Sequence, residues 1–489
     1  MKPSLRVLSS KEEKRIIQEA IQVLEKSGIA LSNTEGLDLL SHAGAKVDRN
    51  SNSISIPEDL IRSALESCPA EFPLYNLEGD PTILYGSDTT FYTPGSSTLF
   101  ILDSATQKLR LVTTKDFIQF VQLVETLPDI DAQSTAMVPN DVPEAIKDLY
   151  RLYLALCYMT KPIITGIFHK QSWEVMVELM ATAAGGKENL QNKPLGIFDI
   201  CPTSPLTWSD TSCQNLIDNA RTGIPIQIVA MPMAGATSPV TLAGTLVQHT
   251  AECLSGIVIA QLANKGAKVV WGGSAAVFDM KHSTAPMGAP GTWLIANAYT
   301  QIGGSLGLPT QAYLGISDAK IVDAQAGMES AAAALLGSLT GVNLISGAGM
   351  LAYENCQSPE KLILDAEMIA SIKHFTRGIQ FRDDPLALDL IKEAGATGDF
   401  LSLEHTFNWF KEEVHYPSPV IDRQPIDTTS QLKSLSAWER AQCRRQELLG
   451  SIPEPALSPD VRSELRKITA RAARSAGMDQ LPHLPDPAQ

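Results

Sequence analysis

The sequence has few of the features that mark secreted, zinc-binding or membrane proteins. Its seven cysteines include no Cys-x-x-Cys pair, which argues against a disulfide framework or a zinc knuckle and fits a reducing compartment. No stretch approaches about 18 uninterrupted apolar residues, and the first residues lead into a polar helix instead of an apolar signal segment. We therefore expect a cytoplasmic protein.

Basic residues are also scarce. Lys and Arg number 39 against 54 Asp and Glu, and the formal net charge is −15. Nucleic acids and anionic membranes are bound by clustered basic side chains, so we expect neither as a partner. No Gly-x-Gly-x-x-Gly follows a predicted strand, and there is no His-x-His pair and no His-Glu-x-x-His motif. A dinucleotide site and a histidine-based metal site are thus disfavoured, and we expect no bound metal.

The residues that are present indicate a large α/β protein. Of 489 residues 44% are hydrophobic, enough for one large domain with appended pieces or for two to three smaller ones. The stretch 308–351 sets the pattern: a strand that ends at Ser317 and Asp318, a proline-free helix from Ala324, and a second apolar run closed by Gly347-Ala-Gly349.

This rhythm recurs along the chain. Predicted strands are 90–93, 130–138, 162–168, 195–200, 225–230, 268–272, 310–316 and 342–345. Predicted helices are 114–126, 143–159, 171–184, 210–221, 240–265, 291–306, 324–339 and 359–377. Strands 98–102 and 108–112 indicate a hairpin inserted after the first strand. Eight Val- and Ile-rich strands that alternate with helices favour a TIM (β/α)8 barrel over the doubly wound open sheet, which uses the same alternation.

Both ends of the chain have a different character. Residues 1–85 are predicted as an N-terminal helical cap, with a capping box at Ser10 to Glu13, a hairpin at 47–56, and helices at 34–43 and 57–68. Residues 86–380 form the barrel domain. Residues 381–489 are a C-terminal helical extension, with helices at 385–393, 400–414, 428–449 and 458–476 and a linker at 424–427. We expect this extension to pack on the barrel or on a neighbouring subunit, and the protein to form a homo-oligomer.

In a barrel, function lies where the strands end at their carboxyl termini. The residues at those positions are mostly aromatic rings and sulfur side chains, which suit an apolar or cationic ligand bound by cation–π contacts. The candidates for substrate binding are Tyr92, Phe168, His169, Asp199, Cys201, Met231, Trp271, Tyr313, Met350 and Tyr353. Each single ring fits a layer of the barrel core equally well; as a set, we interpret them as a cage.

The charged residues at the strand ends have smaller predicted roles. His169 is interpreted as an orienting group, and together with Asn140 and Cys201 as a candidate anchor for a substrate carboxylate. Asp199 and Asp318 could balance a bound cation, or equally cap the following segment. We expect no acid–base residue to be required, with Asp318 and His169 as orienting candidates.

Several segments resemble one known family. The run Ser317-Asp-Ala-Lys-Ile-Val-Asp-Ala-Gln-Ala-Gly-Met-Glu, followed by Gly341-Val-Asn-Leu-Ile-Ser-Gly-Ala-Gly-Met-Leu, resembles the trimethylamine methyltransferase superfamily, as do Trp271-Gly-Gly and Ala285-Pro-Met-Gly-Ala-Pro. The resemblance extends over essentially the whole chain. It implies a TIM barrel that moves a methyl group from an amine to the cobalt of a corrinoid (cobalamin) carried by a separate small protein.

Founding members of that family carry pyrrolysine, whereas this sequence contains only standard residues. The resemblance is therefore to the branch that acts on quaternary amines, among which we favour glycine betaine. The partners implied are a small quaternary amine and a cognate corrinoid protein. Two other readings stay open: a TIM-barrel lyase or aldolase that uses Lys320 or a metal on His169 and Asp199, and a quaternary-amine binding protein without catalysis.

Overall fold

The protein is built around eight parallel strands in two sheets. The computed structural model describes residues 2–48, 53–425 and 435–484. A five-stranded sheet has the order β15-β13-β11-β10-β9, and a three-stranded sheet has the order β17-β18-β6. All pairs within both sheets are parallel. The bounds are β6 Phe91–Pro94, β9 Gln133–Ser134, β10 Ile163–Gly166, β11 Gly196–Ile200, β13 Ile226–Ala230, β15 Val269–Gly273, β17 Gln311–Tyr313 and β18 Leu344–Ala348.

The two sheets approach each other at both edges. A parallel bridge joins Trp271 of β15 to Thr310, just before β17. At the other edge the backbone amides of Asp131 and Ala132, just before β9, donate to the carbonyl of Tyr92 in β6. The fold is α/β as predicted, with each of the eight expected strands present. Regular pairing is interrupted at these two junctions, so the closed barrel stays a prediction.

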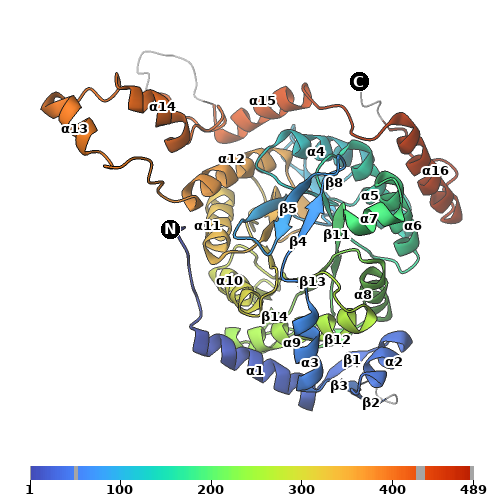
Figure 1. The fold of residues 1–489 in the computed structure, drawn as a ribbon. Coiled ribbons are helices and arrows are strands. Elements are labelled where there is room, and N and C mark those ends of the chain that lie inside the picture. Colours follow the sequence, from blue (N-terminus) through green and yellow to red (C-terminus); the bar gives the residue numbers. More distant parts are fainter. Residues whose placement is uncertain (1, 49–52, 426–434, 485–489) are drawn as a thin grey trace.

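Helices follow one another around the strands (Figure 1). Apart from the short helix α7, which was not predicted, they lie within about two residues of the predicted ranges. Regular apolar spacing and helix caps indicated these bounds, as at Thr113, which forms a capping box with Asp116. Their bounds are α4 Thr114–Thr126, η1 Glu144–Ile146 with α5 Lys147–Tyr158, α6 Ser172–Ala183, α7 Lys187–Asn192, α8 Asp210–Thr222, α9 Leu242–Ala263, α10 Pro290–Ser305, α11 Ala324–Thr340 and α12 Pro359–Thr376.

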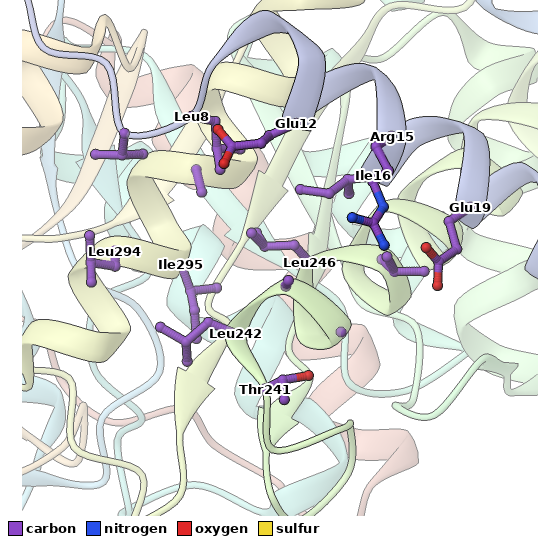
Figure 2. Close-up of a pocket in the computed structure, with 15 residues that line it drawn as sticks. Leu8, Glu12, Arg15, Ile16, Glu19, Thr241, Leu242, Leu246, Leu294 and Ile295 are labelled. Atoms are coloured by element: carbon purple, nitrogen blue, oxygen red, sulfur yellow. The ribbon is translucent and has the colours of Figure 1, made fainter.

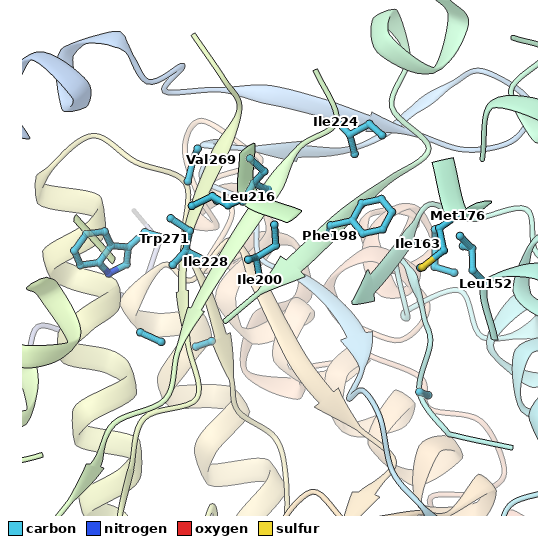
Figure 3. Packing of buried hydrophobic residues seen from close by; sticks show 14 of the residues in the cluster. Leu152, Ile163, Met176, Phe198, Ile200, Leu216, Ile224, Ile228, Val269 and Trp271 are labelled. Atoms are coloured by element: carbon cyan, nitrogen blue, oxygen red, sulfur yellow. The ribbon is translucent and has the colours of Figure 1, made fainter. Parts of the chain in front are cut away.

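The faces of the strands bury different side chains. Residues Phe198, Ile228 and Trp271 pack with the surrounding helices in the largest hydrophobic cluster (Figure 3). Their neighbours Ile197 and Val270 instead join Leu344 of the other sheet in a second cluster. Successive side chains of a strand point to opposite faces, so the two sheets face one another across this second cluster.

The N-terminal region adds a plug and an outer sheet. Hairpin β4 Phe72–Tyr75 and β5 Pro81–Tyr85 contributes Leu74 and Ile83 to the second cluster, which closes one end of the space between the sheets. The other elements of this region are α1 Ser10–Lys26, β1 Ile29–Leu31, α2 Thr34–His42, β2 Lys46–Asp48, β3 Ser53–Ser55 and α3 Glu58–Ser67. The outer sheet also includes β12 Thr207–Trp208, which follows β11 in the chain and pairs with β1. The predicted capping box is wrong by one residue: Ser9 and Glu12 form it. The tip of the predicted hairpin at 47–56, residues 49–52, lies outside the described residues.

Short additional strands lie beyond the ends of the eight parallel strands. The predicted hairpin is formed by β7 Phe100–Leu102 and β8 Leu109–Leu111, which are antiparallel. Sequence periodicity did not indicate β14 Met233–Ala234, β16 Ala276–Val277, β19 Met350–Leu351 and β20 Cys356–Gln357, because two residues are too few for a pattern. By length and hydropathy, helix α9 could cross a membrane, and it is the one such helix among the described residues. Its most apolar 18-residue stretch is, however, 78% buried inside the protein.

The C-terminal region leaves the body and returns to it. Its elements are α13 Leu388–Ala394, η2 Gly395–Thr397, α14 Glu404–Glu413, α15 Ala437–Leu449 and α16 Pro459–Ser475. Helix α15 packs on α12 and α4, and α16 packs on α5 and α6. By contrast α13 and α14 project from the body (Figure 1). Part of the predicted linker and of the predicted helix 428–449, namely 426–434, lies outside the described residues. The division at residues 85 and 380 is a proposal.

Candidate active site

A cavity of about 440 Å³ opens where the parallel strands end. Seven of the eight strands contribute lining residues from their carboxyl ends or the loops that follow, and α8 closes one side. Because these positions converge from distant parts of the chain, they form the natural place for chemistry in this architecture. The lining residues are Ser96, Ser97, Gly166, Ile167, Phe168, Asp199, Ile200, Cys201, Ser212, Asn215, Met231, Ser274, Tyr313, Tyr353, Glu354 and Asn355.

A larger cavity of about 530 Å³ lies elsewhere, between α1 and the first turns of α9 and α10 (Figure 2). Its walls are mainly aliphatic, and its charged side chains Glu12, Arg15 and Glu19 all come from one side of α1. Apart from Thr241 before α9, its polar side chains come from α1 alone. We therefore place the candidate site at the strand ends and not in this groove.

Asp199 is held in the cavity by hydrogen bonds to both of its carboxylate oxygens. Its Oδ1 accepts a 2.6 Å hydrogen bond from Nε2 of Gln227, and its Oδ2 accepts a 3.3 Å bond from the hydroxyl of Tyr313. The hydroxyl of Tyr85 in turn donates a 3.3 Å hydrogen bond to Oε1 of Gln227. Burial raises the pKa of Asp199 to about 7, against these two hydrogen bonds, which lower it.

Glu354 supplies a second carboxyl group from the loop after β18. Its Oε1 accepts a 2.9 Å hydrogen bond from Ser274, and burial followed by the charge of Asp318 raises its pKa to about 7. Ala352, Tyr353 and Glu354 all have left-handed backbone conformations, with φ of 53°, 58° and 67°. Such conformations cost about 1 kcal/mol or more per residue, and strained backbone of this kind concentrates at functional sites.

Aromatic and sulfur side chains complete the walls. Tyr313 is buried and hydrogen-bonds Ser96 at 2.8 Å, while Phe168 and Met231 are 44% and 41% exposed at the rim. Tyr353 stacks under the ammonium of Lys320, whose Nζ lies 3.7 Å from the ring centroid. That ammonium also donates to the backbone carbonyl of Asp318, and Lys320 does not line the cavity.

Behind the rim lies a fully buried arginine. The guanidinium of Arg151 sits 4.5 Å from the ring centroid of Phe168, and its Nη1 donates to Ser97 at 3.0 Å and to the carbonyl of Thr135 at 2.8 Å. Burial lowers its pKa to about 10, so it remains charged at neutral pH. Its Nε and Nη2 have no hydrogen-bond partner. A charged donor therefore stands behind two lining residues, Ser97 and Phe168.

Comparison with known proteins shows the family of this chain. Residues 1–477 match the family model described as trimethylamine methyltransferase. The chain belongs to the trimethylamine methyltransferase family. It is 32% identical to the trimethylamine methyltransferase MttB of Desulfitobacterium hafniense strain DSM 10664 / DCB-2, over 85% of this chain and 83% of that one. It is 31% identical to the glycine betaine methyltransferase of strain Y51 of that species, over 97% and 98%.

The prediction that the protein is a methyltransferase of this family is thus confirmed. The trimethylamine methyltransferase MttB of Methanosarcina barkeri strain Fusaro / DSM 804 is 31% identical over 96% of both chains. The solved structure of the Methanosarcina barkeri monomethylamine methyltransferase aligns with 78% of this chain and 85% of that one, at 11% identity and a TM-score of 0.47. The barrel is therefore argued from the strand pairing of this chain alone.

Six of the ten predicted substrate-binding residues of this family member meet in the cavity. They are Phe168, Asp199, Cys201, Met231, Tyr313 and Tyr353. Burial raises the pKa of the Cys201 thiol to about 12, so it stays neutral there. The cavity is therefore less purely aromatic than the predicted cage, since two carboxyl groups share it with three rings.

The other four lie outside it. Tyr92 is buried against α11, where its hydroxyl hydrogen-bonds Ser338. Met350 is buried in a cluster with Tyr313 and Met287. His169 stands beside the rim, with Nδ1 3.7 Å from Oδ2 of Asp148. Trp271 is buried between the sheet and α9 and α10, edge-on to His249.

Two further candidates, Asp318 and Asn140, also lie outside the lining of the cavity. Asp318 accepts the backbone amides of Met287 and Gly288 at 2.8 and 3.0 Å, which fixes the segment before α10; burial raises its pKa to about 6. Asn140 is exposed and does not line the cavity. Among the described residues no three His, Cys, Asp or Glu side chains gather as a metal site would require.

Replacing Trp271 with alanine should destabilise the protein and leave ligand affinity unchanged. The indole is completely buried, and a large aromatic lost from a core costs about 3–5 kcal/mol of unfolding free energy. Denaturant unfolding and calorimetric titration of a quaternary amine on the same preparation measure both quantities. A weakened affinity with unchanged stability would place Trp271 in the binding site instead.

Sequence reasoning gave no site role to Glu354, Arg151 or Gln227. Glu354 follows the last predicted strand, but a single carboxyl group after a strand gives no further signal. Arg151 and Gln227 lie inside a helix and a strand, and only the fold brings them behind the cavity. A buried arginine in an otherwise apolar helix face was the one available clue.

Proposed function

We propose that the protein transfers a methyl group from a quaternary amine, with glycine betaine favoured, to the cobalt(I) of a corrinoid carried by a separate protein, and releases the tertiary amine. The observation that carries this proposal is a cavity in which three aromatic rings stand beside two half-buried carboxyl groups. Rings attract a quaternary ammonium by cation–π contacts, and the carboxylates balance its charge. Family membership supports methyl transfer as the reaction.

This reaction requires no proton transfer by a side chain of the protein. Cobalt(I) supplies the nucleophile, and the amine leaves as a neutral tertiary amine that needs no proton. The side chains of the cavity then have to bind the ammonium, hold one N–methyl bond toward the opening and exclude water. The absence of a hydrogen-bonded acid–base pair between Asp199 and Glu354 is consistent with this task.

The rim suits a corrinoid partner. Phe168 and Met231 are exposed apolar side chains at the mouth of the cavity. A large flat macrocycle presented by another protein would cover them, and the cavity would then be closed to water. Free apolar groups placed at a mouth are a common mark of an interaction surface.

The charges of the site favour a zwitterionic substrate. Asp199 and Glu354 line the cavity, while the Arg151 guanidinium lies behind Ser97 and Phe168. A substrate with a cationic nitrogen and a carboxylate could direct its nitrogen to the first two and its carboxylate to the Ser97 side. Glycine betaine is the smallest quaternary amine of this kind.

We also propose that the two parallel sheets are one TIM barrel. Its support is the bridge at Trp271, the amides that donate to Tyr92, and the shared cluster of both sheets. The finding that cavity residues come from the carboxyl ends of seven strands agrees with this architecture. We further propose that the protein is located in the cytoplasm.

The test is methylation of cobalt. The protein, reduced cob(I)alamin or a cognate corrinoid protein, and each candidate amine are mixed, and the methyl-cobalt spectrum is followed while the released tertiary amine is quantified. Methylation with glycine betaine and equal amounts of dimethylglycine would support the proposal. Tight binding of quaternary amines without methylation by any corrinoid would favour a binding protein.

Affinity for a quaternary amine should rise with pH between about 5.5 and 8. Asp199 and Glu354 each have a pKa of about 7, and a bound cation favours the ionised form of both. Below pH 7 binding must therefore expel protons, which weakens it by up to about tenfold per pH unit for each group. Calorimetric titrations in buffers of different ionisation enthalpy measure the protons released. Affinity independent of pH would contradict the role of these carboxyl groups.

A further inference from the structure

The loop of residues 352–355 contributes Tyr353, Glu354 and Asn355 to the lining of the cavity. It joins β19 to β20, which pair antiparallel. The backbone conformations of Ala352, Tyr353 and Glu354 are left-handed, and none of the three residues is glycine. Such a run persists only where the surrounding contacts enforce it. Those contacts therefore decide whether Tyr353 and Glu354 reach the cavity.

The polar contacts of the loop come from the loop itself and from the segment after β17. The amide of Ala352 donates to the carbonyl of Ala319 at 3.0 Å, and the ammonium of Lys320 lies over the ring of Tyr353. Nδ2 of Asn355 donates to the carbonyls of Ala352 and Tyr353, both at 3.1 Å. The two segments thus hold each other, and a third element has to fix both against the body.

A small hydrophobic cluster supplies that third element. Most of its members are short side chains from the strands and from the two segments. The largest side chain is the indole of Trp438, which is half-buried and packs against the cluster from α15. Among the described residues, it is the one member from the C-terminal extension. The other members include Leu102, Ala319, Leu351, Ala352 and Cys356.

Helix α15 is held in place by contacts that do not involve Trp438. It lies along α12 and α4 at the edge of the body (Figure 1). Nε2 of Gln442 donates to the carbonyl of Ser104 at 2.7 Å, in the hairpin of β7 and β8. Nη1 of Arg445 donates to Oγ of Ser104 at 2.6 Å and to the buried Glu360 at 3.3 Å. The indole therefore projects from a helix whose position is fixed independently.

We propose that Trp438 is a positioning residue of the candidate site, and that its ring holds the loop 352–355 in the conformation that presents Tyr353 and Glu354 to the cavity. An indole is large and rigid, so one ring supports both the loop and the segment on which the loop rests. The inference rests on the proposed function for its ligand, a quaternary amine. It gives the C-terminal extension a part in binding although no residue of the extension lines the cavity.

Amide hydrogen exchange tests the positioning without a ligand. In Trp438→Ala the amides of Ala352 and Asn355, both hydrogen-bonded in the wild type, should exchange at least about tenfold faster, while those of α15 and β11 keep their rates. Trp409→Ala is the matched control, because Trp409 is also half-buried in the C-terminal extension and lies outside this cluster. Unchanged exchange of the loop in Trp438→Ala would overturn the proposal, as would equally faster exchange along α15.

A double-variant cycle tests the link to the ligand. In calorimetric titrations at pH 8, Trp438→Ala should weaken glycine betaine binding roughly 5- to 10-fold in the wild type and in Asp199→Asn, but less than about twofold in Glu354→Gln, because only residues that act together are non-additive. Trp438→Phe, which keeps a ring, should keep most of the affinity, and Trp409→Ala all of it.

The two experiments separate this inference from the proposed function. The same loss in all three backgrounds would make Trp438 independent of Glu354 and would overturn the inference. A wild type that binds no quaternary amine would instead overturn the proposed function, and the exchange rates of the loop would still decide whether Trp438 positions it.

Discussion

Replacing Asp199 with asparagine should weaken the binding of glycine betaine by roughly 30-fold at pH 8, and replacing Glu354 with glutamine should have a similar effect. A carboxylate about 5 Å from a quaternary nitrogen attracts it by about 3 kcal/mol at an effective dielectric constant of 20. Allowing for water that takes its place, about 2 kcal/mol per carboxylate is a reasonable loss, which corresponds to roughly 30-fold in the dissociation constant. The measurement is calorimetric titration, followed by kcat/KM in the cobalt methylation assay.

The matched ligand for this experiment is 3,3-dimethylbutyrate. It has the shape of glycine betaine, but a neutral carbon replaces the charged nitrogen. Its affinity should change less than about threefold in either variant, because no charge is lost beside it. Asp218→Asn, at a half-buried carboxyl group on α8 that does not line the cavity, serves as the control variant. Equal losses for both ligands would show that the carboxyl groups shape the cavity without recognising charge.

The same substitutions should stabilise the protein. A carboxyl group whose pKa is raised on folding binds more protons in the folded state, so its contribution to stability falls as pH rises from about 4 to about 7. Above pH 7 the wild type keeps two poorly hydrated charges that the variants lack. We expect Glu354→Gln to raise the free energy of unfolding by roughly 1–2 kcal/mol at pH 8 and to have no effect near pH 4. Lower stability of the variant at pH 8 would contradict this account.

Replacing Arg151 with methionine should change which amine the protein prefers. Loss of the buried positive charge behind Ser97 and Phe168 should lower kcat/KM for glycine betaine by roughly 10- to 100-fold, since a unit charge about 8 Å from the substrate carboxylate contributes about 2 kcal/mol at an effective dielectric constant of about 20. Tetramethylammonium has no carboxylate, so its kcat/KM should fall little or rise. The ratio of the two values is the measurement, because it cancels any general loss of active protein.

Methionine is chosen because it preserves the apolar stem that supports Phe168. The neighbouring buried Asp148 keeps its own donors in this variant, namely the amides of Phe168 and His169 at 3.0 and 3.1 Å and the hydroxyl of Ser172 at 2.8 Å. Arg151→Lys retains the charge and should retain part of the preference. A parallel loss for both amines would assign Arg151 to packing alone.

Sequence periodicity predicted the main elements well and the local additions poorly. Helix α4 has the predicted bounds because Thr113 and Asp116 cap it and its apolar spacing is regular. Strand β9 is two residues long where nine were expected, because the apolar run 130–138 continues past the point at which its backbone pairs. Two-residue strands such as β19 exist only through the partner that pairs with them.

The candidate site shows the same limit. The rule that function lies at strand ends selected Asp199, Tyr313 and Phe168, and these three residues line the cavity. It also selected Tyr92 and Trp271, which lie outside the cavity because both are on the face that packs against the helices. In a parallel sheet both faces are buried, so neither carries a polar pattern that would reveal the direction of a side chain.

By itself, the sequence determined the α/β class, the order of strands and helices, and the family, because these depend on local periodicity, caps and motifs. Only the tertiary structure decided which side of each strand faces the cavity, that Glu354 and Arg151 stand near Asp199 and Phe168, and that Trp438 packs against the same cluster as the loop of Glu354. Those properties arise from contacts between segments far apart in sequence, and no local pattern records them.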